Sequence, residues 1–344
     1  MDKTRIKKIA TWIIVPLMGA IFVLDIVTVA LGNAYCKPWT PQKETFTYEY
    51  GNDRIHFLNT ANSDAILIES NGRFALIDAG EGNNNPRRKT AYKGYEDEVR
   101  AYIKQVAADG SGTAPPPFFL WAPPGGVILG THCHYDHIGA FHAIITDPDI
   151  KIDKAYFKQL NPRTDKDYEI ERWKIDETYS QILSDLEALG VPVISDLPRE
   201  EFAFGDFTIK FFNTVTPPEL DGEGENAASV GVKVTKGERT AFLAADITKS
   251  TGLEQLLGGQ IGHVDLLKVG HHGYLGSSSA KFLKQLSPEV AIVTNQLGKV
   301  YPNVKWNLTM IAKVPFFATY DHNGIIASFT DDGRIVLTDR IHDY

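Results

Sequence analysis

The stretch THCHYDHIG, which begins at Thr131, contains three histidines and one aspartate within six consecutive positions. His132 and His134 are two residues apart, so on an extended strand both side chains point to the same face. A loop directly after the strand can turn Asp136 and His137 towards the same place. Imidazole and carboxylate groups are ligands of zinc and similar divalent ions, and a cluster of this size can hold two ions. The motif therefore predicts a metal centre. Cys133, between the first two histidines, is expected to pack as a small apolar residue on the opposite face.

This motif matches the pattern H-x-H-x-D-H, by which the chain resembles the metallo-β-lactamase superfamily over most of residues 45–339. The resemblance implies an α+β fold, a four-layer αββα sandwich. It also implies that Asp78, in ALIDAG, supports the metal loop. Asp246, in FLAADI, matches the carboxylate that bridges two ions, and His271, in LLKVGHHG, matches the last histidine ligand.

The chemistry of such a centre agrees with the resemblance. A carboxylate shared by two cations offsets their repulsion, and a water held between them loses a proton near neutral pH and becomes a nucleophile. We expect Zn²⁺, as one or two ions, with Mn²⁺ as the alternative. Asp136, His137, Asp246 and His271 are expected to hold the tighter ion, and Asp136 is also expected to act in catalysis.

The chain departs from the family at one position. Most members carry another histidine between the cluster and the bridging aspartate, whereas here GENAASVGV places Asn226 near that position. This substitution, with the paired HHG and the following serines, resembles a subgroup that contains the nuclease-like domain of the competence protein ComEC and cell-surface choline-phosphate esterases. The site of His132 and His134 is therefore expected to be weak, with Asn226 or water as third ligand. His272 is a candidate for protonating the leaving oxygen or contacting phosphate.

These residues predict a metal-dependent hydrolase, specifically an extracytoplasmic phosphodiesterase that uses a metal-bound hydroxide. The substrate is expected to be a cell-wall or lipid-linked phosphoester. Ser277 and Tyr274 are candidate substrate contacts, and Ser277 and Ser278 are also candidates for capping the next helix. A choline-like headgroup would need an aromatic cage. The candidates for that cage are Tyr168, Trp173, Tyr274, Tyr301 and Trp306.

Three alternatives remain open for the function. The first is an extracellular or DNA-uptake nuclease, which the acidic composition disfavours. The whole chain has a net charge of −8 and the first eight residues carry +3, so the remainder carries −8 − 3 = −11. The second is a thiolester or lactam hydrolase, which the missing histidine disfavours. The third is a catalytically silent binding module of the envelope.

The N-terminus predicts a membrane segment. Residues 1–8 are basic and are expected to remain in the cytoplasm, because cytoplasmic flanks of membrane helices are rich in Lys and Arg. Residues 9–32 are apolar and long enough to span a bilayer, although they include Pro16 and Asp25. They are interpreted as a signal anchor, a cleaved signal peptide, or a buried helix of a soluble protein. A tether (33–44) and the catalytic domain (45–344) follow, with the domain outside the cytoplasm or secreted after cleavage.

The elements that must position these residues alternate between strands and helices. The opening is β-rich, with a hairpin at Asn71-Gly72. Helical spacing follows over 95–108 and again over 165–189, and the last helix before the closing strands is expected over 280–286. Two β-rich halves, each followed by helices, predict two packed sheets with helices on both outer faces.

An insertion, residues 114–126, precedes the strand that leads to the histidine cluster. Its sequence, APPPFFLWAPPGG, combines stiffening prolines with an apolar run. It enters at the end of the strand opposite to the expected metal ligands. Phe119 and Trp121 are therefore predicted either to pack against the domain or to dip into the membrane surface.

Overall fold

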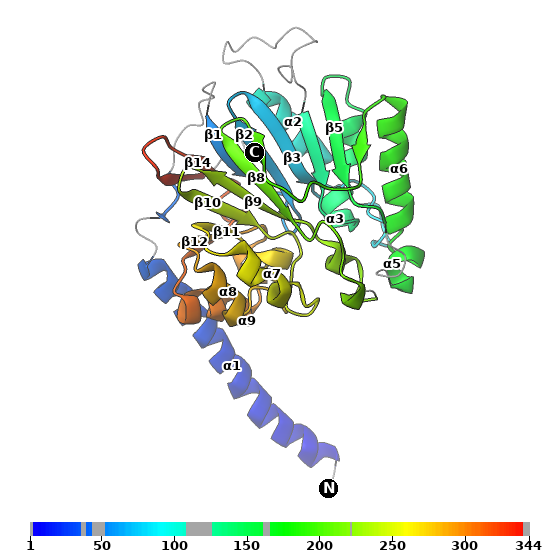
Figure 1. Ribbon diagram of the computed structural model, residues 1–344. Helices are drawn as coiled ribbons and strands as arrows, with labels where there is room; N and C mark the ends of the chain where they lie inside the picture. The colour runs from blue at the N-terminus through cyan, green and yellow to red at the C-terminus, as the bar shows by residue number, and fades with distance from the viewer. Residues whose placement is uncertain are drawn as a thin grey trace.

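Two mixed β-sheets pack face to face, and helices cover the outer face of each in the computed structural model (Figure 1). The structure describes residues 3–35, 39–42, 52–107, 126–160, 166–220 and 222–339. The expected four-layer αββα sandwich, preceded by an N-terminal apolar helix, is confirmed.

The first sheet has the order β15-β14-β1-β2-β3-β4-β5-β6. Strands β3 to β6 are parallel to one another, and the other neighbours are antiparallel. The strands are β1 (Asp53–Phe57), β2 (Ala65–Ser70), β3 (Arg73–Ala79), β4 (Gly126–Gly130), β5 (Ile152–Phe157), β6 (Val193–Ile194), β14 (Ile325–Phe329) and β15 (Ile335–Asp339).

The second sheet has the order β13-β12-β11-β10-β9-β8-β7, with β10 to β13 parallel. In each sheet the parallel strands send their carboxyl ends to one edge, where loops can gather side chains from neighbouring strands. The strands are β7 (Phe202–Phe204), β8 (Phe207–Phe212), β9 (Gly231–Lys236), β10 (Arg239–Leu243), β11 (Leu266–Lys268), β12 (Val290–Val293) and β13 (Phe316–Ala318).

Helices form the two outer layers. Those on the first sheet are α2 (Glu96–Ala107), α3 (Tyr135–Ile138), α4 (Phe141–Ile145), α5 (Asp167–Glu171) and α6 (Ile175–Ala188). Those on the second are α7 (Leu253–Ile261), α8 (Ala280–Leu286), α9 (Pro302–Trp306) and the π-helical turn η6 (Asn307–Ala312). The short turns η3 (Glu225–Ala228) and η4 (Gly270–Gly273) lie at the edge where the carboxyl ends of the strands gather.

Alternation along the strands builds three apolar layers. On β3, Leu76 packs towards the helices, whereas the next residue, Ile77, packs between the sheets. On β10, Phe242 faces α7 and α8, whereas Leu243 faces the other sheet. Because successive strand residues point to opposite faces, these runs are buried on both sides, which explains their nearly continuous apolar sequence.

Several elements differ from the sequence expectations. The helix expected over 165–189 is two helices, because the chain breaks between them at Lys174, whose φ is +56°. Strands β5 and β13 and the helix α9 were not expected. Residues 108–125 lie outside the described part of the chain, and with them Phe119 and Trp121 of the insertion.

Helix α1 (Lys3–Tyr35) is longer than the expected segment 9–32 and contains an apolar window, Thr11–Thr28, that is long enough to cross a membrane. In the expected tether, residues 33–35 belong to this helix, while residues 36–38 and 43–44 lie outside the described part. Gln42 already pairs with Thr338, next to the first sheet. Figure 1 shows α1 leaving the domain beside α8 and α9, with its N-terminal half away from the domain.

Candidate metal centre

The histidine cluster lies directly after β4, at the carboxyl end of the parallel strands. His132 and His134 follow the strand, and the short helix α3 begins with Tyr135 and carries Asp136 and His137. The backbone N–H of His137 donates to the carbonyl of His134 at 3.0 Å, which turns the second half of the motif back towards the first. The motif therefore bends after β4 and then becomes helical, which brings all four side chains to one edge.

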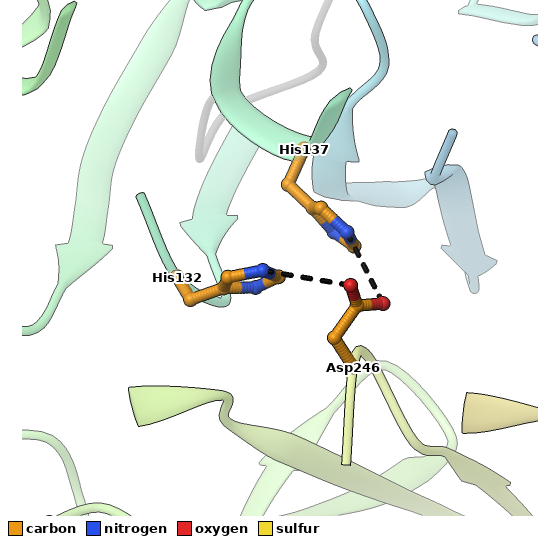
Figure 2. Close-up of side chains that lie close together, drawn as sticks. All are labelled: His132, His137 and Asp246. Carbon is orange, nitrogen blue, oxygen red and sulfur yellow. Dashed lines mark ion pairs between the residues drawn. The ribbon is translucent and has the colours of Figure 1, made fainter. Parts of the chain in front are cut away.

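Asp246 reaches the same place from the second sheet, after β10. Its Oδ1 lies 3.2 Å from Nε2 of His137, and its Oδ2 lies 3.8 Å from Nε2 of His132. Figure 2 shows the two imidazoles on one side and Asp246 approaching from the other. Ala245, the preceding residue, has φ +44°, an uncommon conformation for a residue with a side chain. The centre is therefore assembled across the interface of the two sheets.

His271 and His272 both lie close to Asp246, each nearest a different oxygen of its carboxylate. Both have positive φ, +49° and +50°, so the chain turns sharply instead of sending neighbouring side chains to opposite faces. His272 is buried, with Nε2 at 3.5 Å from Oδ1 of Asp246 and 3.8 Å from Oδ2 of Asp136. His271 has 29% exposure, and its Nε2 lies 3.8 Å from Oδ2 of Asp246. The geometry thus places His272 beside Asp136 and His137, where the sequence reasoning expected His271.

Four imidazoles share one arrangement: the outer nitrogen faces an oxygen, and the inner nitrogen faces the centre. The Thr131 and Thr294 hydroxyls donate to Asp78 and Asp64, so each hydroxyl oxygen accepts from an imidazole N–H. Outer acceptors of this kind select the tautomer and orientation of histidines that bind metals. The pairs are His132 Nδ1 with Thr131 Oγ1 (3.1 Å), His134 Nε2 with Glu169 Oε1 (3.1 Å), His137 Nδ1 with Asp78 Oδ2 (2.7 Å) and His272 Nδ1 with Thr294 Oγ1 (3.2 Å).

The inner atoms fit a cation better than they fit one another. Nε2 of His137, Nε2 of His272 and Oδ1 of Asp246 are buried and have no hydrogen-bond partner. Nε2 of His132 lies 3.2 Å from Nδ1 of His134, and with both protons on the outer side this contact joins two lone pairs. Buried polar atoms are rarely left without a partner, so these atoms fit a bound ion.

Groups of three residues within the described part of the chain could hold a metal ion, with their ligand atoms within 4.8 Å of one another. The groups overlap at Asp64, His137, Asp246 and His272, so the structure offers one compact centre with several ligands in common. They are His132, His137 and Asp246; Asp136, His137 and His272; Asp64, Asp246 and His272; and Asp64, Asp78 and His137.

The electrostatics of the centre also favour a cation. Burial disfavours the charge of Asp246, but His137, His272 and His271 outweigh burial and hold the pKa of Asp246 well below its ordinary value. Burial likewise opposes protonation of His137, but Asp246 and Asp78 raise the pKa of His137 well above its ordinary value. Burial and the neighbouring His137 lower the pKa of His132. The carboxylates thus attract positive charge to the interior of the centre, while His132 keeps a free lone pair.

Asp78 has the supporting geometry expected of it. Its Oδ1 accepts from the backbone N–H of Thr131 at 2.8 Å, and its Oδ2 accepts from the Thr131 hydroxyl and from His137, both at 2.7 Å. Asp78 itself has φ +56°. This carboxylate therefore ties the end of β3 to the start of the histidine motif.

Sequence reasoning missed a second buried support, Asp64 with Lys268. Both side chains are buried and form an ion pair, and the ammonium of Lys268 also donates to the carbonyl of Ala245 at 3.0 Å. Oδ1 of Asp64 lies 3.3 Å from Nδ1 of His272. A lysine inside the apolar run LLKVG was the available signal, because a charged residue in a buried strand requires a partner.

An open cavity of about 570 Å³ lies over the centre. Arg87 enters it from the loop after β3: its guanidinium lies 3.2 Å from Oδ1 of Asp136 and stacks over Trp173 at 4.3 Å. Tyr168 packs edge-on against Trp173, with ring centroids 4.8 Å apart. Arg88 also lines the cavity and pairs with Glu81. Two guanidinium groups and an aromatic wall thus accompany the metal ligands, and neither arginine was expected.

The remaining candidate residues occupy different places. Asn226 and Tyr274 line the cavity, and Nδ2 of Asn226 lies 3.5 Å from Nε2 of His271. Ser277 is buried and donates to the carbonyl of Tyr274, while the cap of α8 is Ser279 rather than Ser277 or Ser278.

Of the five aromatic candidates, Tyr168, Trp173 and Tyr274 line this cavity, whereas Tyr301 and Trp306 do not. Cys133 is buried among the apolar residues between the first sheet and its helices. Its backbone N–H donates to Glu225.

No protein-family model matches the chain. Over 84 residues the chain is 31% identical to Recombination protein 2 of Haemophilus influenzae. This match covers 24% of this chain and 10% of that protein. Over 173 residues it is 27% identical to ComE operon protein 3 of Bacillus subtilis, and this match covers 48% of this chain and 19% of that protein. The chain thus spans only a small part of the length of these relatives.

Similar solved structures include Zn²⁺-bound PqqB from Methylobacterium extorquens (12% identity, TM-score 0.46, 79% of this chain and 99% of that one). Another is the metallo-β-lactamase fold protein YhfI from Bacillus subtilis, with 11% identity and a TM-score of 0.43 over 79% of this chain and 98% of that one. A third is CmlA, a diiron β-hydroxylase from Streptomyces venezuelae, with 14% identity and a TM-score of 0.38 over 75% of this chain and 48% of that one.

The layers and the motif positions of this chain define a metallo-β-lactamase fold. The sequence is similar to segments of two ComEC-like proteins. The fold and the candidate ligand groups support a metal-dependent hydrolase as the general class.

Proposed function

We propose that this protein is a membrane-anchored, metal-dependent phosphodiesterase whose catalytic domain, residues 45–344, lies outside the cytoplasm. The observation that carries the proposal is the arrangement of four imidazoles, each held by an outer oxygen acceptor while its inner nitrogen faces the centre around Asp246. Residues 1–8 would remain in the cytoplasm, and residues 9–32 would anchor the chain.

In the ligand assignment that we propose, the residues around Asp246 would hold two metal ions. Oδ1 of Asp246 lies near His137 and His272, and Asp136 would complete that set. Oδ2 lies near His132 and His271, and His134 would complete the other set. His271 then takes the place of the family histidine that this chain lacks near Asn226. Imidazole-rich sets of this kind suit Zn²⁺, with Mn²⁺ as the alternative. When bound, the ions lower the pKa of a water molecule and polarise the bond to be hydrolysed.

The preference for a phosphodiester rests on the cavity. Arg87 presents a guanidinium beside Asp136, and guanidinium groups recognise phosphate oxygens through paired hydrogen bonds. The aromatic wall of Tyr168 and Trp173 offers a flat apolar surface for the ester group, and it suits a quaternary ammonium such as choline. These chain groups bind and orient the substrate while the metal ligands hold the reacting centre.

Metal analysis and a substrate panel test this proposal. Purified full-length protein should bind one or two Zn²⁺ ions and should hydrolyse bis(p-nitrophenyl) phosphate faster than p-nitrophenyl phosphate or a β-lactam. His272→Ala and His271→Ala should each lower the metal content, while His263→Ala, a change at an exposed histidine beside Asp265, should leave both metal and turnover unchanged. Full metal content in both variants would contradict the ligand assignment. Metal binding without turnover of any ester would favour the silent binding module instead.

A nuclease is the second candidate, and the similarity to Recombination protein 2 and ComE operon protein 3 is the observation that favours it. The acidic chain disfavours strong binding to a polyanion. Metal-dependent cleavage of DNA that weakens steeply with salt, at a rate above that on small phosphodiesters, would support the nuclease over the proposed activity.

A further inference from the structure

Helix α1 is attached to the catalytic domain by a partly buried ion pair. Nζ of Lys305, on α9, lies 2.8 Å from Oδ2 of Asp25, with 3% exposure of the lysine side chain and 26% of the aspartate. Thr28, less than one turn further along α1, is also buried. The helix packs against α9 and η6 in this region. Asp25, which is unfavourable in a membrane segment, therefore belongs to a contact with the domain rather than to a lipid-facing surface.

The N-terminal part of α1 has the opposite character. Its apolar side chains are exposed along the helix, with 57% exposure at Leu17, 65% at Met18 and 66% at Phe22. A contiguous apolar surface of this kind fits lipid. The 16 residues from Ile9 to Leu24 span about 24 Å at about 1.5 Å per residue, whereas the hydrocarbon core of a bilayer is about 30 Å thick. The ion pair at Asp25 therefore leaves no length for a spacer between the membrane and the domain.

From this we infer that the outer face of α9 and η6 lies in the headgroup layer of the membrane as a second lipid contact beside α1. Three exposed residues of this face are apolar, with 37% exposure at Trp306, 37% at Met310 and 40% at Ile311, and Asn303 is an exposed polar residue of the same segment. Trp306 and Met310 are four residues apart and share one side of the helical segment. Tryptophan is enriched at the boundary between headgroups and acyl chains.

Two exposed lysines, Lys299 and Lys313, flank the same segment. Lysines next to a lipid-contacting segment are attracted to anionic headgroups. The ring of Tyr301, at the start of α9, packs against Tyr274 with centroids 5.8 Å apart, and Tyr274 lines the cavity over the metal centre. The lipid contact therefore places the rim of the cavity near the headgroup layer.

Probes at two positions test the lipid contact without depending on catalysis. Full-length protein, with Cys36 and Cys133 replaced by serine, is labelled with a polarity-sensitive dye at Met310→Cys. It is then reconstituted into vesicles of phosphatidylcholine and phosphatidylglycerol. The matched control is Leu189→Cys, which is 58% exposed and lies at the end of α6, in the other helical layer. A blue shift of the dye at position 310, absent at position 189, supports the inference, and equal emission at both overturns it.

Tryptophan fluorescence provides a second test that needs no cysteine replacement. The difference between wild type and Trp306→Phe reports the emission of Trp306, and the difference for Trp173→Phe reports a residue of the cavity. Lipids brominated near the headgroup should quench the Trp306 emission and leave the Trp173 emission unchanged. Undiminished Trp306 emission, or a mature chain that begins after residue 34, overturns the inference. Either result leaves the hydrolase proposal to its own metal and substrate tests.

Discussion

Replacing Lys268 by methionine removes the buried positive charge beside the metal centre while keeping a side chain of similar length. Lys268 has 0% exposure and pairs with Asp64, which has 1%. Removing one partner of a buried ion pair costs roughly 3–5 kcal/mol, because the remaining charge stays out of water. Asp64 keeps the hydroxyl of Thr294 and lies near His272, so we expect the lower end, about 3 kcal/mol. For a domain of this size that corresponds to a fall in Tm of roughly 5–10 °C.

Urea unfolding of the full-length protein in detergent, with a chelator present, measures this loss without a contribution from bound metal. The double variant Lys268→Met with Asp64→Asn should recover most of the loss, because neither charge then remains unpaired. Lys281→Met, at an exposed position on α8, should change the free energy of unfolding by no more than about 0.5 kcal/mol. The reasoning fails if Lys268→Met costs less than about 1 kcal/mol, or if the second substitution brings no recovery.

Three further predictions concern the centre, the cavity and α7. Asp246→Ala should remove both turnover and most of the bound metal, and full activity by a phosphodiesterase assay would contradict the hydrolase assignment. Arg87→Ala should raise KM for an anionic diester about tenfold, because it removes one hydrogen bond to a charged group, while Arg87→Lys should retain part of the affinity. Equal KM values for wild type and Arg87→Ala would exclude a phosphate contact. Burial raises the pKa of Glu254 from 4.5 to about 7, against hydrogen bonds from Ser279. A raised folded-state pKa contributes stability that is fully present below pH 4.5 and is lost as the pH rises through 7. The free energy of unfolding of Glu254→Gln should therefore rise relative to wild type by about 3 kcal/mol across that window. Parallel pH profiles of the two proteins in urea titrations would refute this.

The sequence by itself determined the architecture and the first half of the centre. The helical spacing of Val99, Tyr102, Ile103 and Val106 predicted the buried face of α2, because a period of 3.6 residues leaves one arrangement of apolar side chains. The H-x-H-x-D-H motif is local, so its four residues lie together whatever the rest of the chain does. The fold followed from the same motif and from the alternation of strands and helices.

Only the tertiary structure decided which residues complete the centre. His271 and His272 are neighbours, and two successive positive φ angles direct them to different oxygens of Asp246, which no spacing rule predicts. Asp64 and Lys268 are 204 positions apart, and their pairing exists only because the two sheets meet at this edge.

The same limit applied at the N-terminus. Hydropathy predicted a membrane segment and marked Asp25 as a defect in it. The partner of Asp25 lies 280 residues away on α9, so only the packing of α1 against the second helical layer accounts for that charge. Local patterns thus identify ligands and helices, whereas the partners of buried charges are chosen by contacts between distant segments, which the sequence does not encode as a period or a motif.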